Sequence, residues 1–177
     1  MAASGENVTL YTLGHSRHAI EGFIELARCH DVSLIVDVRG QPYSRFNPQY
    51  NRERLENALA EHDIDYLWFG DQLSGRPKDP EFRGPDGKVL WDKLKQWPDL
   101  HEGIAEVLER AAGTHLALVC AEEDPMRCHR RFLLTPPLSE RGARVLHIRG
   151  DGRIQSEDEL RNTEDSSTGG AQLTLFD

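Results

Sequence analysis

Two nearly continuous apolar runs constrain the fold of this chain most strongly: SLIVDV at residues 33–38 and HLALVC at residues 115–120. A strand with one face in water alternates apolar and polar residues, whereas a strand covered on both faces, as in a parallel sheet, can be apolar throughout. Both runs therefore predict central strands of a parallel sheet. No apolar run approaches the ~20 residues that a membrane-spanning helix needs, so no membrane partner is expected.

Patterns typical of strands and helices alternate along the rest of the chain. Three further runs have strand composition: residues 8–13, 64–69 and 143–148. Apolar residues at helical spacing indicate helices near residues 20–27, 51–62 and 104–111. Asn51 is placed to cap the second of these helices. The alternation predicts an α/β fold, a mostly parallel sheet flanked by helices in a Rossmann-like three-layer sandwich.

The chain is predicted to consist of one domain and a tail. Residues 1–150 carry the strand and helix patterns and are enough for one hydrophobic core. Residues 71–89 are rich in Gly and Pro and predict a long loop. Residues 151–171 are polar and acidic, which is typical of a flexible, disordered linker, apart from a short turn near residues 154–160. An apolar cluster, QLTLFD at residues 172–177, ends the chain.

Charge and cysteine content limit the functional classes. The net charge of -9 argues against a broad basic surface, although a local basic patch can still bind nucleic acid. Cys29, Cys120 and Cys128 cannot all pair within one chain, which indicates reduced thiols in a reducing compartment. The N-terminal residues show no basic region followed by a long apolar stretch, so a secretory signal is not expected and the cytoplasm is the expected location.

Reactive side chains follow the predicted strands. Ligands of parallel sheets bind beyond the carboxyl ends of the strands. The five strand ends carry GHS (14–16), DVRGQPYSR (37–45), FGDQLSGR (69–76), CAEEDPMRCHR (120–130) and HIRG (147–150). A functional site is therefore expected at this edge of the sheet.

The cysteines near the fourth of these strand ends allow a metal site or a thiol site. Zinc ligands usually lie two to four residues apart, whereas seven residues separate Cys120 from Cys128, so no metal and no cofactor are predicted. Cys120 is interpreted as a buried strand residue. Cys128 is expected near a helix start, beside His129, Arg127 and Arg130, which would lower its pKa and permit a nucleophilic or redox role.

Two carboxylates end two of the predicted strands. Asp37 and Glu122 could face one cleft, where carboxylates perform general acid–base chemistry or stabilise an oxocarbenium-like state. His15 or His129 would assist proton transfer. The structural alternative is that Asp37 simply pairs with Arg39.

Arginines and aromatic residues near the strand ends predict an anion-binding cleft. Arginine's planar fork suits phosphates, and aromatic rings can stack on bases. The arginines expected to bind substrate are Arg39, Arg45, Arg127 and Arg130, with Tyr43 expected to join them. The aromatic residues near these loops are Tyr43, Phe46, Tyr50, Trp68 and Phe69. The alternative is that some of these arginines pair with Glu122 or neighbouring acids.

The motifs TLGHS, DVRGQPYSR, YLWFGDQLSG and CAEEDPMRCHR, in this order, resemble the prokaryotic family called domain of unknown function 488. The resemblance covers residues 9–149 and implies an α/β fold with the motif residues at one end of the sheet. It implies these site residues: His15, Ser16, Asp37, Arg39, Pro42, Ser44, Glu122, Cys128, His129 and Arg130. The chain departs from the family pattern at Ser74, where the family tends to have a second glycine. Pro136 and Pro137 are expected to break or kink the helix that contains them.

The C-terminal QLTLF resembles the pentapeptide with which bacterial DNA polymerases and repair proteins hold the sliding clamp. Gln172 would hydrogen-bond at the rim of the clamp groove, while Leu173, Leu175 and Phe176 would fill it. Residues 161–171 would span ~18 Å as a flexible coil. The alternative is a tail that folds back onto its own domain.

Together the two resemblances imply a DNA transaction. The expected function is a hydrolytic enzyme that acts on a damaged or modified nucleotide at the sliding clamp, with N-glycosidic cleavage of a flipped base favoured over a metal nuclease. Two alternatives remain open. One is a non-catalytic adaptor that binds a nucleotide or nucleic acid on the clamp, and the other is a thiol-dependent enzyme centred on Cys128.

Overall fold

The sheet of this protein has six strands in the order β3-β2-β4-β1-β5-β6. The computed structural model describes the backbone of residues 8–171 and the side chains of residues 8–166. The strands are β1 (Thr9–Gly14), β2 (Leu34–Asp37), β3 (Asp65–Trp68), β4 (Leu116–Cys120), β5 (Arg144–Ile148) and β6 (Ile154–Ser156). All neighbours pair in parallel except β5 and β6, which are antiparallel. The predicted α/β class with a mostly parallel sheet is confirmed.

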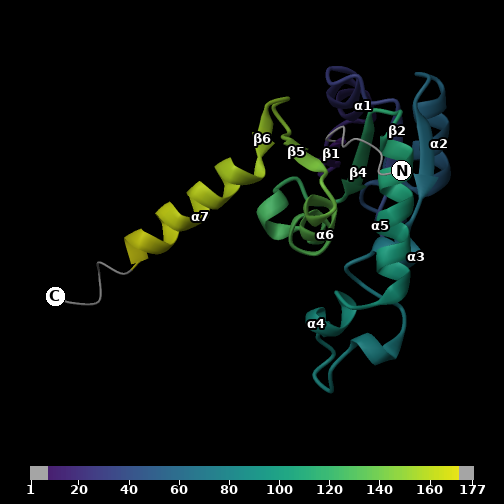
Figure 1. The fold of residues 1–177 in the computed structure, drawn as a ribbon. Helices are drawn as coiled ribbons and strands as arrows, with labels where there is room; N and C mark the ends of the chain where they lie inside the picture. The colour runs from purple at the N-terminus through teal and green to yellow at the C-terminus, as the bar shows by residue number, and fades with distance from the viewer. Residues whose placement is uncertain (1–7, 172–177) are drawn as a thin grey trace, which may run out of the picture.

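Helices cover both faces of the sheet, as Figure 1 shows. The longer segments are α1 (Ile20–Arg28), α2 (Arg52–Ala60), α5 (Pro98–Ala111), α6 (Thr135–Glu140) and α7 (Glu157–Ala171). Short ones are η1 (Pro48–Tyr50), α3 (Gly70–Leu73), η2 (Pro80–Phe82), α4 (Trp91–Leu94), η3 (Pro125–Arg127) and the π-helical η4 (Arg130–Leu134). Helices α1 and α2 pack on one face, and α5 and α6 pack on the other.

Strand β4 shows why its sequence is apolar throughout. Ala117 and Val119 join the core beneath α1 and α2, whereas Leu116 and Leu118 join the core beneath α5 and α6. Every residue of β4 is therefore buried. Burial on both faces removes the period-two alternation that a half-exposed strand would show.

The segment predicted as a long loop, residues 71–89, contains α3, η2 and an isolated bridge between Arg83 and Val89. Phe82 anchors it in the core, 3% exposed, with its ring centroid 5.2 Å from that of Trp97. A buried aromatic side chain explains how a segment rich in Gly and Pro keeps one conformation.

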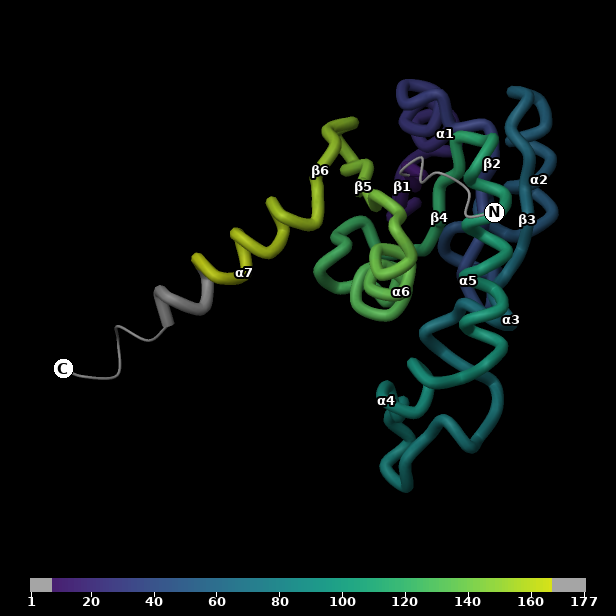
Figure 2. Tube along the Cα trace, viewed as in Figure 1, coloured from purple at the N-terminus to yellow at the C-terminus, as the bar shows by residue number. Residues whose placement is uncertain are grey.

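Residues 151–171, which were expected to form a flexible linker, contain regular secondary structure. Residues 154–156 form β6, and α7 follows directly. The helix starts with a reciprocal capping box: Glu159 N donates to Ser156 Oγ (3.3 Å), and Ser156 N donates to Glu159 Oε2 (2.7 Å). Leu160 is fully buried. Figures 1 and 2 show α7 leading away from the sheet beyond this anchor. The clamp-like peptide, residues 172–177, lies outside the described residues.

Arg131 ties α7 to the domain. Its Nε donates to Glu157 Oε1 (3.0 Å) and its Nη1 to Glu164 Oε1 (2.6 Å), and the arginine is only 13% exposed. We expect Arg131→Ala to accelerate amide hydrogen exchange throughout α7 and leave the central strands unchanged, because only the helix loses its tether. Arg161→Ala is the control, since Arg161 is 65% exposed and its Nε lies 3.9 Å from Glu157 Oε2. Equal exchange in the two variants would contradict this tether.

Pro136 and Pro137 were expected to break or kink their helix, and the structure has a π-helical turn directly before them. The chain does not break there, because the π-helical η4 runs directly into α6, which contains both prolines. Thr135 Oγ1 donates to Arg130 O at 2.9 Å within this turn. A π-helical turn is one of the usual ways to accommodate residues that cannot complete the regular helix ladder.

No helix within residues 8–171 is both long and apolar enough to cross a membrane.

Candidate active site

The carboxyl ends of three adjacent strands are joined by backbone hydrogen bonds. His15 N donates to Cys120 O (2.9 Å), and Ser16 N donates to Ala121 O (2.8 Å), which connects the end of β1 to β4. Val38 N donates to Val119 O (3.1 Å), which connects β2 to β4. The residues that follow these strands therefore lie together, as the strand-end rule predicts.

Asp37 is fully buried and serves as an anchor for Arg39. Arg39 Nε donates to Asp37 Oδ1 (2.9 Å), Arg39 Nη2 donates to Oδ2 (2.6 Å), and the Tyr66 hydroxyl donates to Oδ2 (2.7 Å). This is the structural alternative for Asp37, and it corrects the expectation of a free carboxylate in the cleft. A carboxylate with both oxygens occupied by a cation and a hydroxyl is not available as a base.

His15 connects the Arg39 pair to the end of β1. Its Nδ1 lies 3.0 Å from Ser16 O, and its Nε2 lies 3.1 Å from Arg39 Nη1. Only a neutral ring with its proton on Nδ1 can donate to that carbonyl and accept from that guanidinium. The ring stacks on Tyr50, with centroids 4.1 Å apart. Burial, and secondly the charge of Arg39, lower the pKa of His15 to about 4. His15 therefore positions Arg39 and is uncharged at neutral pH.

The His15 pKa predicts a specific loss of stability in acid. The folded protein binds this proton near pH 4, and the unfolded chain binds it near pH 6.5. The contribution of neutral His15 to the free energy of unfolding is fully present above pH 6.5. It is lost as the pH falls from 6.5 to 4, and the total loss is about 3 kcal/mol. Urea unfolding at several pH values checks this: His15→Gln should lose less stability than the wild type over that range. Equal losses would contradict the assignment.

Glu122 lies at the rim of the site, away from Asp37's hydrogen bonds. Its side chain is exposed, and among the described residues no hydrogen bond or ion pair engages its carboxylate. Its backbone carbonyl lies over Gly14, where a Cβ atom would collide with it. The structure therefore does not join Asp37 and Glu122 as a carboxylate pair, and only Glu122 is free to meet a substrate.

Cys120, Cys128 and His129 form a compact cluster at the end of β4. The His129 Nδ1 atom lies 3.7 Å from Cys120 Sγ and 3.8 Å from Cys128 Sγ. The cysteines are 8% and 2% exposed. His129 Nε2 is also buried and has no hydrogen-bond partner among the described residues. The expectation that Cys120 is a purely structural strand residue is corrected, because its sulfur faces this cluster.

The two thiols have opposite pKa shifts. The pKa of Cys120 lies well below its ordinary value because the Cys128 thiol donates to it, with further support from His129 and the charge of Arg130. The pKa of Cys128 is raised by its hydrogen bond to Cys120 and by burial. Cys128 precedes the helical segment in extended conformation, so the predicted lowering of its pKa by a helix start is wrong.

Arg130 is fully buried and holds the loop after β4. It donates to the backbone carbonyls of Glu122 and Glu123, and its Nε donates to Thr12 Oγ1 (3.1 Å). Within residues 8–166 no carboxylate forms an ion pair with it. Arg130 therefore fixes the site from within, which corrects its expected role in binding substrate phosphates.

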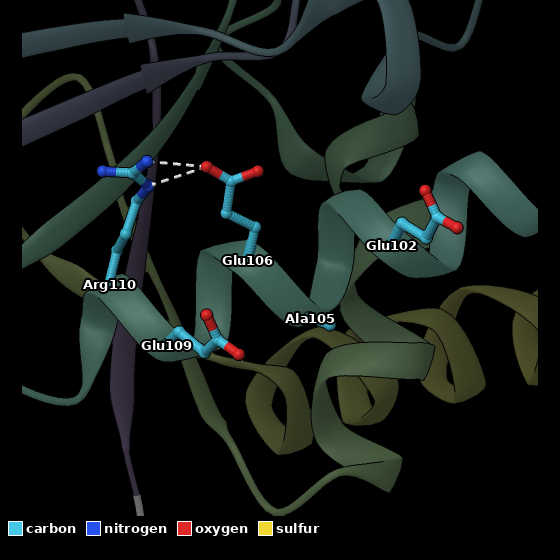
Figure 3. Close-up of a pocket in the computed structure, with 5 residues that line it drawn as sticks. All are labelled: Glu102, Ala105, Glu106, Glu109 and Arg110. Atoms are coloured by element: carbon cyan, nitrogen blue, oxygen red, sulfur yellow. Dashed lines mark hydrogen bonds and ion pairs between the residues drawn. The ribbon is translucent and has the colours of Figure 1, made fainter.

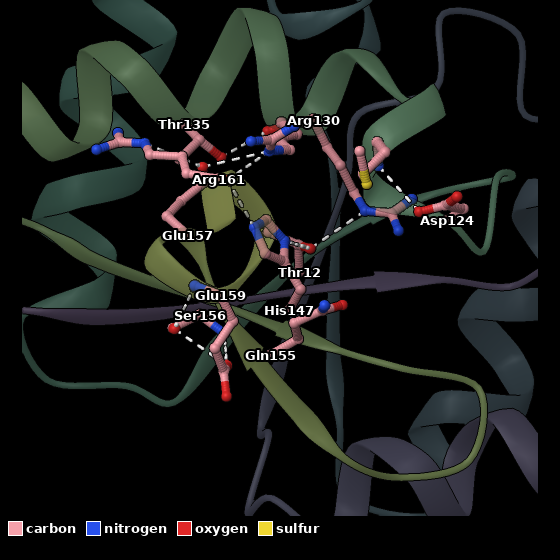
Figure 4. Close-up of polar contacts among 12 residues, drawn as sticks. Thr12, Asp124, Arg130, Thr135, His147, Gln155, Ser156, Glu157, Glu159 and Arg161 are labelled. Atoms are coloured by element: carbon pink, nitrogen blue, oxygen red, sulfur yellow. Dashed lines mark hydrogen bonds and ion pairs between the residues drawn. The ribbon is translucent and has the colours of Figure 1, made fainter. Parts of the chain in front are cut away.

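A polar relay that sequence reasoning missed continues from Arg130 to α7. Thr12 Oγ1 lies 2.7 Å from His147 Nδ1, and His147 Nε2 lies 2.9 Å from Glu157 Oε1 (Figure 4). Thr12 and His147 are both fully buried. Polar residues inside two otherwise apolar strands were the available signal, since buried polar groups need partners.

Close contacts position the loop that follows α3, which contains Ser74 and Gly75 and lies on the His129 ring. A Cβ atom on Gly75 would lie 2.6 Å from the His129 Cβ, so glycine allows this loop to lie directly on the imidazole. Ser74, the departure from the family pattern, accepts a hydrogen bond from Arg76 N (2.9 Å) and lies against Gly40. The extra hydroxyl therefore stabilises the loop.

The loop after β2, residues 40–47, carries the most exposed aromatic side chains of the described residues. Tyr43 is 71% exposed and Phe46 is 79% exposed, with the Arg45 guanidinium 4.8 Å from the Phe46 ring centroid. Ser44 has a structural role, because its hydroxyl accepts from the amides of Phe46 and Asn47, both at 3.1 Å.

The remaining predicted residues have varied positions. Pro42 is half-buried and its carbonyl accepts from Arg52 N (3.0 Å). Ser16 is half-buried with φ at +46°, and Arg127 is exposed at the end of η3. Asn51 occupies the predicted N-cap of α2, but its side chain accepts instead from Ser44 N (2.7 Å).

Two hollows lie outside the cluster. One of about 270 Å³ borders Gly40 and includes Arg76, Phe82 and Trp97 in its lining. The other, of about 520 Å³, is a shallow depression on α5 lined by Glu102, Ala105, Glu106, Glu109 and Arg110 (Figure 3). The Glu106–Arg110 pair occupies it, and none of its residues belongs to the strand ends.

The comparisons with known proteins return one match. The family model described as "Domain of unknown function DUF488" matches residues 19–135, well over half of the chain. No curated protein and no solved structure matches significantly.

Proposed function

The chain belongs to the DUF488 family, and we propose that it is a DNA-processing enzyme with its hydrolytic site at the carboxyl edge of the sheet. The observation that carries the DNA assignment is the loop of residues 40–47. It presents Tyr43, Arg45 and Phe46 to solvent beside the strand ends. Aromatic rings that stack on bases, together with a cation that meets phosphates, are the elements of sequence-tolerant binding to unpaired nucleotides.

The reaction that this site supports best is cleavage of the N-glycosidic bond of an extruded base. Glu122 supplies an exposed carboxylate at the rim to stabilise a sugar cation or activate water, and His129 supplies an imidazole near it in the chain. Arg39 is held in place by Asp37 and His15. The hollow beside Gly40, lined by aromatic side chains together with both cations and aspartates, offers space for a base taken out of the stack.

Recruitment to DNA is assigned to the C-terminal peptide. Gln172, Leu173, Leu175 and Phe176 have the chemistry of a clamp-binding pentapeptide, one polar residue followed by an apolar cluster. Binding of the clamp by this peptide raises the effective concentration of the domain near DNA. Deletion of residues 172–177 is expected to abolish co-purification with a bacterial sliding clamp and to preserve DNA binding by the domain. Clamp binding by the deleted protein would refute this assignment.

The DNA assignment is tested by fluorescence anisotropy with an oligonucleotide that carries a mismatched base. Tyr43→Ala and Phe46→Ala should each weaken binding roughly tenfold, because one stacked base contributes ~1–3 kcal/mol. Arg45→Ala should lower the salt dependence by about one phosphate contact. Leu90→Ala is the matched control, since Leu90 is an apolar side chain that is 42% exposed and lies just before α4, outside residues 40–47. Unchanged affinity in all three loop variants would refute the assignment.

A further inference from the structure

We propose that Cys120, Cys128 and His129 bind a zinc ion. Their sulfur and nitrogen ligand atoms all lie within 4.8 Å of one another. Among the described residues, the three form no ion pair and no side-chain hydrogen bond outside the cluster, and the Arg130 backbone amide also donates to the Cys128 sulfur. The inference shares His129 with the proposed reaction, but it concerns metal binding itself, which is measured without any enzymatic assay.

The distances match a tetrahedral zinc site. With Zn–S bonds of ~2.3 Å and Zn–N bonds of ~2.0 Å, tetrahedral angles place sulfur and nitrogen about 3.5 Å apart. In the structure Cys120 Sγ lies 3.7 Å and Cys128 Sγ 3.8 Å from His129 Nδ1. Only small side-chain movements are needed to close the set around one ion.

The donor types select the metal. Two cysteine sulfurs and an imidazole are soft or borderline ligands, which suit zinc and are poor ligands for magnesium, calcium or manganese. Two thiolates also cancel the double charge of the ion, so the loaded cluster adds no net charge to a buried site.

The backbone holds the ligands in place without the ion. Cys120 ends β4, while Cys128 follows η3, which Asp124 caps by accepting from Met126 N (3.1 Å). The Arg130 guanidinium donates hydrogen bonds to the backbone carbonyls of Glu122 and Glu123, in the loop between the two cysteines. This loop brings the two cysteines together in space although seven residues separate them in sequence. The spacing of the ligands in the sequence therefore did not indicate the site.

Three ligands leave one coordination position for an exchangeable group, within the part of the chain that the structure describes. Three protein ligands are typical of catalytic zinc, whereas structural zinc has four. The buried charge of Arg130, which forms no ion pair with a carboxylate within residues 8–166, favours an anion at that position. We assign it to hydroxide or to an anionic oxygen of a ligand.

The test uses the full chain purified without chelator. Elemental analysis should find zinc equimolar with protein in the wild type and in Cys29→Ser, whose exposed cysteine lies outside the cluster. Cys120→Ser and Cys128→Ser should bind zinc more weakly by at least ~10-fold, the loss expected even when only an outer partner is removed. Circular dichroism confirms that each variant is folded.

Cobalt titration of the chelator-stripped wild type gives a readout that needs no variant. Thiolate coordination should produce an intense sulfur-to-cobalt absorption band, and zinc should displace it. The proposal would be overturned if the wild type gave no such band. It would also be overturned if Cys120→Ser and Cys128→Ser gave a band as strong as that of the wild type. Rapid alkylation of Cys120 that added zinc fails to slow would overturn it too and would indicate a free reactive thiol.

Discussion

Replacing Asp37 with alanine is expected to destabilise the protein by about 3–5 kcal/mol, because it leaves the buried Arg39 charge without its partner. Arg39 is 9% exposed, and both oxygens of Asp37 are engaged. Urea unfolding at neutral pH measures the loss. The same change should free the His15 ring, since Arg39 Nη1 would no longer be held 3.1 Å from its Nε2.

Tyr66→Phe is the matched control for this prediction. It removes one hydrogen bond to Asp37 Oδ2 and leaves the ion pair intact, so the expected loss is about 1 kcal/mol. If Asp37→Ala costs no more than Tyr66→Phe, the Asp37–Arg39 pair is not the anchor of this edge.

Gly14→Ala is expected to be the most disruptive small substitution at the site, with a loss of about 3 kcal/mol. An added Cβ would overlap the Glu122 carbonyl, which is backbone and is itself held by Arg130. The end of β1 and the loop after β4 would have to separate. Thermal unfolding and the exchange of the Ser16 amide, which bonds to Ala121 O, report this separation.

Gly22→Ala provides the contrast for Gly14→Ala. Nothing lies within 4 Å of a Cβ atom on Gly22, which is in the first turn of α1. Alanine there should stabilise the helix by about 0.5–1 kcal/mol. Similar effects of the two substitutions would show that the contact at Gly14 relaxes without cost.

The central sheet could be predicted because its strands have an unusual local composition. Residues 33–38 and 115–120 are apolar on both faces, and such strands fit only between two layers of helices. The sequence analysis missed the C-terminal helix α7 because the polar composition of residues 151–171 outweighed the short capping-box pattern at its start. Ser156 and Glu159 have the spacing of a capping box, but the helix also depends on Arg131, which is distant in sequence.

That the residues after the strands lie together followed from the sequence, whereas the contacts of their side chains did not. Asp37 and Arg130 are charged groups at strand ends, and their sequence context does not show that the structure buries both. The partners of Cys120 are set by a loop that returns the chain to the end of β4. Distances between residues on different segments decide such roles, and single-sequence patterns carry no information on them.

Release of a base from modified DNA tests the proposed function most directly. The full chain is incubated with strands that each carry one damaged or modified base, and free base is measured by chromatography. We predict release from at least one strand and a loss of roughly 100-fold or more in Glu122→Gln, which keeps the size of an exposed side chain and should keep DNA binding. No released base from any strand, or undiminished release by Glu122→Gln, would contradict the account.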